Sequence, residues 1–536
     1  MIDWMSEDTK CLLVGPKFSD YHFLNYSEIC KFKGAKYPVS PLGLMTAAAL
    51  LPQNWQFKLI DENVETLKNE HFEWADLICT GGMLSQQARV LAIIDKAHAY
   101  DRPVVVGGPD ATSQPHLYQS ADYLVLGEGE NTIPLFLKDL ENGCRSGQYQ
   151  SSQKANLNNS VIPRFDLIRF KNYAQIAVQF SRGCPFNCEI CDVSVFFGKK
   201  FQMKGSDQII KELQGLYDAG YRGSIFLADD NFTADKNSAK QTLPEIKEWS
   251  KAHNYPFFFG SQCSIDLVDD EELMEIMRDV DFRWVVIGIE TPEDEILRSI
   301  KKKQNIKRQY QQTFKKLLSY GMIVHVTLIL GFDNENDRTA DRMLKTIEDS
   351  AAPVAYIGLL EALPNTQFTK RLESEGRLLE ESLIQKNPVF DKMTSGLNFI
   401  TKRPKTEILK DYIKVLSIAY NPKIYYKRAT YTAMNLKPAY KYIPSTREIL
   451  KMVRTALRVC LAVGFDKITG VHFWKMLFIL LVKNPRGILI ALEFSAYYIH
   501  FYGQSKFLID FTNRRIEETK LYEEKYNQLS KRYLDQ

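Results

Sequence analysis

The sequence has little net charge and few cysteines. Lys and Arg number 69 and Asp and Glu 65 among 536 residues, so the formal net charge is only +4. This balance excludes a surface built to coat nucleic acid, and a hydrophobic content of 45% excludes a disordered chain. Nine cysteines are too sparse for a scaffold held by disulfides. We therefore expect a globular small-molecule enzyme with reduced thiols and no nucleic-acid partner.

Features that direct a chain out of the cell or across a membrane are also missing. The start, MIDWMSEDTKCLLVG, is acidic and lacks the basic segment and apolar run of a signal peptide. The most apolar stretch, 473–482, is too short to span a bilayer. We expect a cytoplasmic protein in which 473–482 and the apolar residues from 488 form a helical hairpin. This hairpin either packs against the rest of the protein or makes peripheral contact, through 473–502, with the inner membrane or a lipid.

Residues 1–145 alternate short apolar runs with helical patterns. Runs such as KCLLVGP, ADLICTGG and DYLVLGEGE are strand-like and end near Gly, Pro or Asp. This rhythm predicts a Rossmann-like domain, an open parallel sheet with helices on both faces. Ligands of such sheets bind beyond the carboxyl ends of the strands, where glycines let the backbone approach them, although ordinary tight turns are the alternative for each loop. The candidate ligand residues are Gly81, Gly82, Ser85, Gly107, Gly108, Thr112, Gly127 and Glu128.

Composition divides the rest of the chain into three parts. Residues 146–162 contain few large apolar side chains and are expected to be a linker. Residues 163–370 contain six strand candidates separated by helical patterns, which predicts a partial (β/α)6 barrel with its chemistry at the carboxyl ends of the strands. Residues 371–536 form a mainly helical domain rich in Tyr, Lys and Arg.

Three cysteines lie close together where the first barrel strand ends, in SRGCPFNCEIC. They are Cys184, Cys188 and Cys191. A structural zinc site takes four protein ligands, and no second Cys or His pair with suitable spacing lies nearby. Three thiolates suit a 4Fe-4S cluster, because they leave one iron open to a substrate or cofactor. The other six cysteines are expected to be core residues.

The C-x-x-x-C-x-x-C spacing resembles the signature of the radical S-adenosylmethionine (SAM) superfamily. The resemblance implies that the three cysteines hold a 4Fe-4S cluster, that its open iron chelates SAM, and that reductive cleavage of SAM gives a 5′-deoxyadenosyl radical. It also implies an electron donor such as flavodoxin or ferredoxin. One departure is Ile190, where the superfamily usually has an aromatic residue. The strand-end segments that the resemblance places beside SAM contain the candidates Asp229, Asp230, Ser261, Glu290 and Gly331, for which strand caps and turns are the alternative role.

A doubly wound domain before such a barrel resembles the class B, cobalamin-binding radical SAM methyltransferases. The resemblance implies that loops 80–87 and 107–113 hold the dimethylbenzimidazole tail of cobalamin. The Asp-x-His-x-x-Gly loop of many corrinoid binders is missing, because Asn63 stands where His would be. The sequence therefore offers no lower axial imidazole at this loop.

The resemblance implies C-methylation of an unactivated carbon in a small-molecule or lipid substrate. The segments 393–399 and 420–429 are similar to the subgroup that contains the hopanoid C-2 methylases, which favours a hopanoid-like lipid. A cobalamin-dependent radical SAM cyclase or oxidase is one alternative, and a non-catalytic cobalamin-binding scaffold is another. A methylthiotransferase is disfavoured, because the sequence has neither a second amino-terminal cysteine set nor a terminal RNA-binding β-domain.

Overall fold

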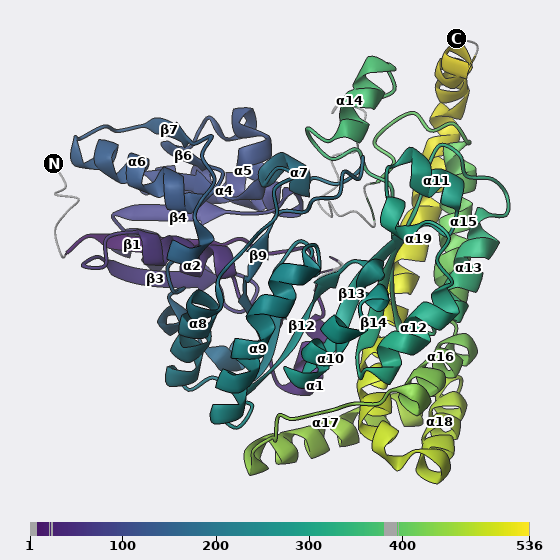
Figure 1. Ribbon diagram of the computed structural model, residues 1–536. Coiled ribbons are helices and arrows are strands. Elements are labelled where there is room, and N and C mark those ends of the chain that lie inside the picture. Colours follow the sequence, from purple (N-terminus) through teal and green to yellow (C-terminus); the bar gives the residue numbers. More distant parts are fainter. Residues whose placement is uncertain (1–7, 21, 23–24, 380–393, 395, 535–536) are drawn as a thin grey trace.

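A parallel six-stranded sheet forms the core of the amino-terminal part (Figure 1). The computed structural model describes residues 8–20, 22, 25–379, 394 and 396–534. The strand order is β3-β1-β4-β5-β6-β7, so the chain moves to one side of β1 and then to the other. Ligands of such sheets bind at this switch point, beyond the carboxyl ends of the strands. The strands are β1 Lys10–Gly15, β3 Gln56–Asp61, β4 Leu77–Gly81, β5 Val104–Gly107, β6 Tyr123–Leu126 and β7 Gly147–Gln150.

Alternating side chains of these strands feed two hydrophobic cores, as the period of two residues in a strand requires. Leu12 and Val14 belong to one core, which also contains buried residues of the helix α4. Cys11 and Leu13 point into the other core, which continues into the rest of the molecule. The predicted Rossmann-like domain with helices on both faces is confirmed. Its helices are α2 Leu42–Leu50, α3 Asn69–Trp74, α4 Gln87–His98, α5 Pro109–Ser113 and α6 Gly129–Glu141.

The second sheet is a curled half-barrel of seven parallel strands, in the order β15-β14-β13-β12-β11-β8-β2. Six of them follow the predicted partial barrel. Because all are parallel, their carboxyl ends meet at one edge, where the cysteine loop leaves β8. The strands are β2 Tyr37–Val39, β8 Tyr173–Val178, β11 Gly223–Leu227, β12 Phe257–Cys263, β13 Phe282–Glu290, β14 Ile323–Leu330 and β15 Val354–Leu359.

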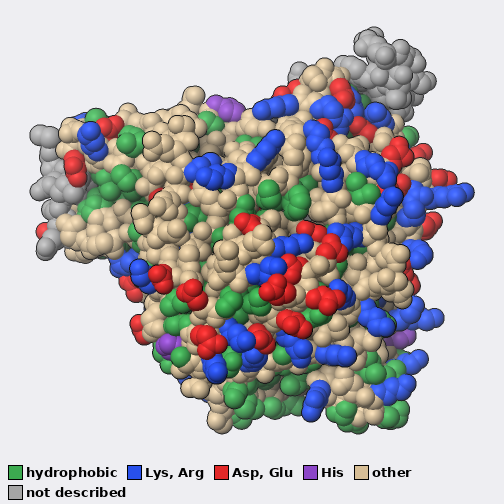
Figure 2. All heavy atoms as spheres, viewed as in Figure 1, with side chains coloured by type: hydrophobic (Ala, Val, Ile, Leu, Met, Phe, Trp, Pro, Cys, Tyr) green, Lys and Arg blue, Asp and Glu red, His purple; other side chains and the backbone are tan. Residues whose placement is uncertain are grey.

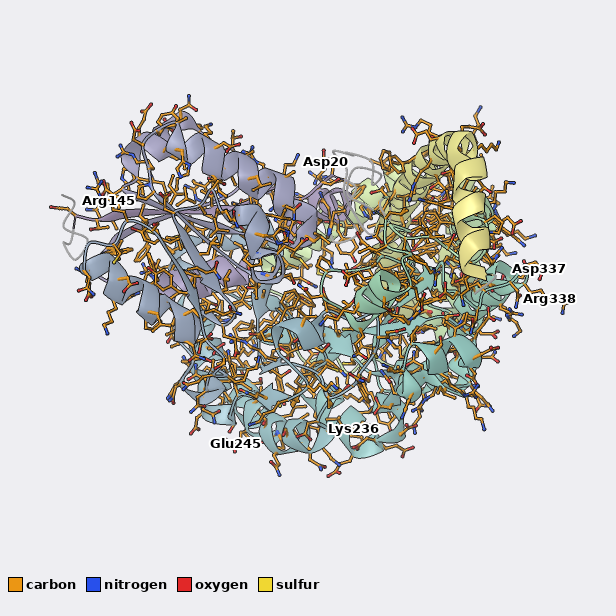
Figure 3. All side chains as sticks on the ribbon, turned by 90° about the horizontal axis from the view of Figure 1, so that it is seen from above. Asp20, Arg145, Lys236, Glu245, Asp337 and Arg338 are labelled. Carbon is orange, nitrogen blue, oxygen red and sulfur yellow. The ribbon has the colours of Figure 1, made fainter. Side chains whose placement is uncertain are left out.

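Helices connect successive barrel strands and cover the outer face of the sheet (Figure 1). Their apolar stripes are buried, as in α8, where Ile209, Leu213 and Leu216 are inaccessible to solvent. The helices are α8 Ser206–Asp218, α9 Lys236–Ala252, α10 Glu271–Asp279, α11 Asp294–Ser299, α12 Tyr310–Ser319, α13 Thr339–Ser350 and α14 Gln367–Ser374. Seen from above, Arg145, just before β7 of the first sheet, and Asp337, after β14, lie at opposite ends of the molecule (Figure 3).

The two strands β2 and β7 change the predicted domain limits. β2 lies within the range 1–145 but pairs with β8 of the barrel, so the amino-terminal part contributes a strand to both sheets. β7 lies within the expected linker 146–162 but pairs with β6 along its whole length. Its polar sequence GQYQ suits an edge strand with a single buried side chain, Tyr149, which is why composition indicated a linker. The remaining limits stay a prediction.

The carboxy-terminal part is helical, as expected (Figure 1). The helix α19 lies beside the helix α1 near the amino-terminal ends of the barrel strands. Lys33 of α1 and Glu493 of α19 form an ion pair there, with 2.7 Å between Nζ and Oε1. Of the segment 393–399, residues 393 and 395 lie outside the described residues. The helices are α1 Ser27–Lys33, α15 Lys405–Ala419, α16 Pro422–Asn435, α17 Thr446–Gly464, α18 Thr469–Lys483 and α19 Ile488–Leu534.

The apolar hairpin expected at 473–502 is formed by α18 and the first part of α19. Ala491, Phe494 and Phe501 of α19 are buried, so much of this half of the range packs into the core, whereas Leu489 is exposed. Contact through 473–502 stays a prediction, because helical periodicity does not tell which apolar face a neighbour covers. Within the described residues, no helix is both long and apolar enough to cross a bilayer.

Candidate functional site

The cysteine loop begins on a short β-ribbon and is held by a glycine that no other residue could replace without strain. The ribbon pairs β9, Ser181–Arg182, with β10, Gln202–Met203. Gly183 has a φ of +82°, and a Cβ there would lie 2.7 Å from the carbonyl oxygen of Lys200. Left-handed backbone is available to glycine at little cost. The local sequence Arg-Gly-Cys therefore turns the chain sharply into the three cysteines.

Two carboxylates at the end of β11 fix this loop. Asp229 accepts hydrogen bonds from the Phe180 N–H at 2.8 Å and the Ser181 hydroxyl at 2.6 Å. Asp230 accepts one from the Gly183 N–H at 2.9 Å. Burial raises the pKa of Asp229 to about 7 and that of Asp230 to about 6. Both predicted SAM-side residues thus lie beside the cysteine loop, and Asp229 serves to hold the chain.

Each of two cysteine sulfurs faces a side-chain amide from a later barrel segment. The Asn231 amide lies 3.7 Å from Cys184 Sγ and donates to it, and the Gln304 amide lies 3.8 Å from Cys188 Sγ. The Asn231 amide also donates to the Ser264 hydroxyl at 2.6 Å, which fixes its orientation. Hydrogen bonds to cluster sulfurs tune reduction potentials in iron–sulfur proteins. Sequence reasoning missed both amides, since single Asn and Gln residues carry no spacing signal.

The chemistry of the three cysteine thiols fits a 4Fe-4S cluster. Burial raises the pKa of Cys184, and it raises the pKa of Cys191 to about 12, so bound metal is needed to keep these sulfurs as thiolates. No three His, Cys, Asp or Glu side chains among the described residues are close enough together to share a single metal ion. A 4Fe-4S cluster is larger, and each thiolate takes its own iron.

The other three SAM-side candidates lie at the carboxyl ends of β12, β13 and β14. Glu290 ends β13 with a φ of +63° and pairs with Lys302 at 2.5 Å. Ser261 is fully buried, and its hydroxyl donates to the Leu227 carbonyl oxygen at 3.3 Å, so it faces the strand beside it. Gly331 donates its N–H to Glu335 at 2.9 Å. Burial by itself would lower the pKa of Lys302, but Glu290, Cys188 and Cys191 raise it overall, so the ion pair with Glu290 lies within electrostatic reach of two of the cysteines.

A cavity of about 310 Å³ lies where the amino-terminal loops meet the cysteine loop. The loops after β4, β5 and β6 form one wall, and the helix α7, Val193–Phe196, with Asp230 forms the facing wall. Gly127 has a φ of +85°, and no atom lies within 4 Å of where its Cβ would be. The predicted residues that line the cavity are Ser85, Gly108, Thr112, Gly127 and Asp230.

Gly81, Gly82 and Gly107 support the cavity wall without lining it. A Cβ on Gly81 would lie 2.2 Å from the Gly107 carbonyl oxygen, so these two glycines let adjacent loops approach. A Cβ on Gly82 would lie 2.9 Å from Gln86 Cβ. The Thr112 hydroxyl accepts from the Gly127 N–H at 2.9 Å and joins two of the loops. An open wall of glycine backbone fits a large cofactor tail, as cobalamin requires.

Arg182 joins the cysteine loop to the amino-terminal domain. Its guanidinium pairs with Glu128 at 3.1 Å and with Glu130 at 2.7 Å, and all three side chains are at most 14% exposed. Burial by itself would raise the pKa of Glu130, but Arg182 lowers it overall. The predicted cofactor residue Glu128 therefore faces Arg182 rather than the cavity. The acidic GEGE loop was visible in the sequence, but its partner was not.

The structure shows what surrounds Asn63 and Ile190, the two residues at which the sequence departs from the family pattern. The Asn63 side chain accepts from the Phe18 N–H at 2.9 Å and donates to Asp61 at 2.7 Å, so it is engaged within its own loop and does not line the cavity. His22 is a histidine that does line the cavity, although no motif marks it. Ile190 packs against the main hydrophobic core.

Comparison with protein-family models divides the chain in the same way as the fold. The B12 binding domain matches residues 33–137, and the radical SAM superfamily matches 178–347. A domain of unknown function, DUF4070, matches 366–510. The three matches follow one another along the chain and correspond to the first sheet, the half-barrel and much of the helical part.

Curated relatives cover nearly the whole chain. An uncharacterized methyltransferase of Synechocystis sp. is 38% identical over 483 residues, which span 89% of this chain and 88% of the relative. A hopanoid C-2 methylase of Rhodopseudomonas palustris is 29% identical over 473 residues, 87% of this chain and 88% of that one. These matches include the carboxy-terminal helices as well as the two cofactor domains.

Solved structures share the fold at low sequence identity. The cobalamin-dependent SAM radical enzyme OxsB aligns with a TM-score of 0.59 at 15% identity, over 99% of this chain and 84% of that one. The radical SAM methyltransferase TsrM of Kitasatospora setae aligns with a TM-score of 0.55 at 16% identity, over 73% and 79%.

Fold, cysteine loop and domain order together define the class: the chain belongs to the cobalamin-binding radical SAM family. Within this family it is a cobalamin-dependent radical SAM methyltransferase. Its cofactors are a 4Fe-4S cluster, SAM and cobalamin, which supply reductive cleavage of SAM and carriage of a methyl group. The predicted family, fold class and cofactors are confirmed.

Proposed function

We propose that the protein methylates an unactivated carbon of a hopanoid-like polycyclic lipid. The observation that carries this proposal is the cavity between the two cofactor domains, where a substrate carbon would meet both cofactors. Its cysteine-loop side presents Val193, Phe196 and Phe197, and Leu363 and Pro364 also line it. Apolar walls suit a hydrocarbon substrate, because they remove its surface from water. The hopanoid C-2 methylase, which aligns through the helical part as well, supports the same substrate class.

We propose the following roles for the residues of the site. Cys184, Cys188 and Cys191 hold the cluster, with Asn231 and Gln304 donating to two of the sulfurs. Asp230 and Glu290 bind SAM from the ends of β11 and β13. The cobalamin tail binds to three loops. The first contains Gly81 and Gly82, the second contains Gly107 and Gly108, and the third contains Gly127. A flavodoxin or ferredoxin supplies electrons to the cluster.

The test is anaerobic incubation of the reduced holoenzyme with a hopanoid and SAM that carries a deuterated methyl group. We expect the lipid to gain a trideuteromethyl group in place of one hydrogen, and that hydrogen to leave on 5′-deoxyadenosine. A lipid that is oxidised or cyclised without gaining the label would identify the cyclase or oxidase alternative. Absence of 5′-deoxyadenosine from reconstituted, reduced protein would identify the scaffold alternative.

A matched control separates lipid chemistry from adventitious methylation. The Cys188→Ala variant should bind cobalamin as the parent does, because the first sheet is untouched, but should give no labelled lipid. A parent enzyme that forms 5′-deoxyadenosine but leaves every hopanoid unlabelled would retain the enzyme class and overturn the lipid substrate.

A further inference from the structure

Exposed apolar side chains are concentrated on two helices of the carboxy-terminal part. Of the twenty large hydrophobic residues exposed in the described part of the chain, fourteen fall between residues 449 and 489. Figure 2 shows hydrophobic and basic side chains along the lower edge of the molecule, where Figure 1 places α17 and α18. We name this region the α17–α18 surface. Its apolar members are Ile449, Leu450, Met452, Val453, Leu457, Leu461, Phe465, Ile468, Val471, Trp474, Phe478, Leu481, Val482 and Leu489.

On α17 the exposed apolar residues form a stripe. Leu450, Val453, Leu457 and Leu461 recur at intervals of three or four residues, which places them on one helix face. Each is more than half exposed. The buried residues Val459 and Val463 lie on another face, toward the rest of the protein. The stripe is therefore a second apolar face, in addition to the one that packs α17 onto its neighbours.

The helix α18 repeats this arrangement. Val471, Trp474, Phe478 and Val482 have the same spacing and are exposed, whereas residues such as Phe473 and Leu480 are buried on the other side. The Trp474 indole N–H donates to the Gly464 carbonyl oxygen at 2.9 Å, which joins the end of α17 to α18. Phe465, between the helices, is 77% exposed. The apolar stripes thus continue from one helix to the next.

Charges in the same region have one sign. Between residues 449 and 489 there are seven basic residues and a single acidic one, Asp466. All seven basic side chains are exposed, and none forms an ion pair with an acidic side chain in the part of the chain that the structure describes. On α17, Arg454 and Arg458 follow the apolar stripe at one residue's offset, so they border it. The basic residues are Lys451, Arg454, Arg458, Lys467, Lys475, Lys483 and Arg486.

We propose that the α17–α18 surface binds the face of a lipid bilayer that carries anionic headgroups. Helices that lie in a membrane interface combine Leu, Phe and Trp on one side with Lys and Arg beside them, because the apolar stripe enters the acyl boundary while the cations meet the phosphates. A second copy of the chain is a poorer partner, because a symmetric contact would bring seven unpaired cations against seven more. Protein interfaces are also depleted in Lys.

The proposed surface lies away from the candidate active site and does not depend on the identity of the substrate. The chain entering α17 contacts the amino-terminal ends of barrel strands: Lys441 and Tyr442 donate their backbone N–H groups to Asp281, just before β13. The cysteine loop follows the carboxyl end of β8, at the opposite edge of the same parallel sheet. Changes on the surface should therefore leave SAM cleavage intact.

Flotation of the anaerobically purified holoenzyme with vesicles tests the proposal. We expect the protein to float with vesicles of equal parts phosphatidylcholine and phosphatidylglycerol, and at least about tenfold less with phosphatidylcholine alone. Raising the salt from about 0.1 M to about 0.5 M should weaken binding, because the headgroup charges are then screened. The double variant Leu457→Glu/Phe478→Glu should lower partitioning about a hundredfold.

Matched variants keep the result interpretable. Leu135→Glu/Ile162→Glu alters two apolar residues exposed elsewhere and should float like the parent. Arg454→Ala/Arg458→Ala should lose about fivefold per cation on anionic vesicles, whereas Lys315→Ala/Lys410→Ala should not. If the glutamate variant fails to fold, the Arg454→Ala/Arg458→Ala variant still tests the proposal. A parent that floats with neither vesicle, or surface variants that float like the parent, would overturn the proposal. So would a parent dimer in light scattering that Leu457→Glu disperses.

Discussion

The cysteine loop and the α17–α18 surface differ in how their side chains are partnered. At the cysteine loop polar groups pair with distant segments, as when Arg182 meets Glu128 and Glu130 across the two cofactor domains. On the α17–α18 surface large apolar groups such as Leu457 have no cover. The cysteine loop therefore fixes the positions of its side chains, whereas the α17–α18 surface leaves apolar side chains open to contact with a partner. Substitutions in the first should therefore act on chemistry and folding, and those in the second on partitioning.

The largest effect should come from the cluster ligands. Cys184→Ala removes one of the three thiols that hold the cluster and should lower 5′-deoxyadenosine formation about 10⁴-fold or more, because reductive cleavage of SAM needs the intact cluster. The measurement is chromatography of the reduced reaction, with iron content determined on the same sample. Cys460→Ala on α17 is the matched control and should keep both iron and activity. Retained turnover in Cys184→Ala would remove the basis for the site.

Breaking the link between the domains should have the next largest effect. Arg182→Met leaves two buried carboxylates without their cation and should lower the free energy of unfolding by about 3 kcal/mol. Arg164→Met, which breaks the more exposed pair with Asp166, should lower it by less than about 1 kcal/mol. Denaturant unfolding of the holoenzyme measures both. Equal losses in the two variants would mean that Arg182 does not link the domains.

Lowering the pH should destabilise the fold through a buried histidine of the barrel. Burial lowers the pKa of His325 to about 4, so below the ordinary pKa of about 6.5 the unfolded chain takes up a proton that the folded chain does not. His325 should therefore contribute a loss of about 3 kcal/mol as the pH falls from about 6.5 to 4. His325→Phe should flatten this part of the stability curve, measured by unfolding at several pH values. A parent curve without this slope would contradict the assignment.

Substitution of a glycine in the cavity wall should have a smaller effect, on cobalamin affinity, and a second glycine provides a matched control. Gly127→Val and Gly143→Val both place a side chain at positive φ in open space, at +85° and +79°, so their backbone strain is alike. Only Gly127 lines the cavity. We expect cobalamin affinity to fall about tenfold for Gly127→Val and to be unchanged for Gly143→Val, in a titration followed by corrinoid absorbance. Equal affinities would place the cobalamin tail elsewhere.

The smallest effect should be on stability at the α17–α18 surface. Leu457→Glu and Phe478→Glu change side chains that are 60% and 68% exposed, so each should alter the free energy of unfolding by less than about 0.5 kcal/mol. Met476→Glu, at a buried position of α18, should cost several times more. Denaturant unfolding provides the comparison. A large loss for Leu457→Glu would show that this residue supports the fold.

Local patterns in the sequence predicted most of the architecture. The six strands expected between residues 163 and 370 are all present, as β8 and β11 to β15, because a buried parallel strand is a short apolar run between breakers. The spacing of Cys184, Cys188 and Cys191 predicted the cofactor class for a similar reason, since the three ligands lie in one loop. By contrast, β7 has too few apolar residues to be recognised, and β2 gave no sign of which sheet it would join.

The sequence by itself determined the two wound sheets, the cysteine loop and the helical carboxy-terminal part, because each depends on residues close together along the chain. Only the tertiary structure decided that Arg182 meets Glu128 and Glu130, and that Asn231 and Gln304 reach the cysteine sulfurs. It also decided that Ala491, Phe494 and Phe501 of α19 are buried while α17 and α18 keep an open apolar face. These outcomes depend on which distant surfaces meet. Burial and pairing are properties of the packed chain, and helical periodicity reveals an apolar face without revealing what covers it.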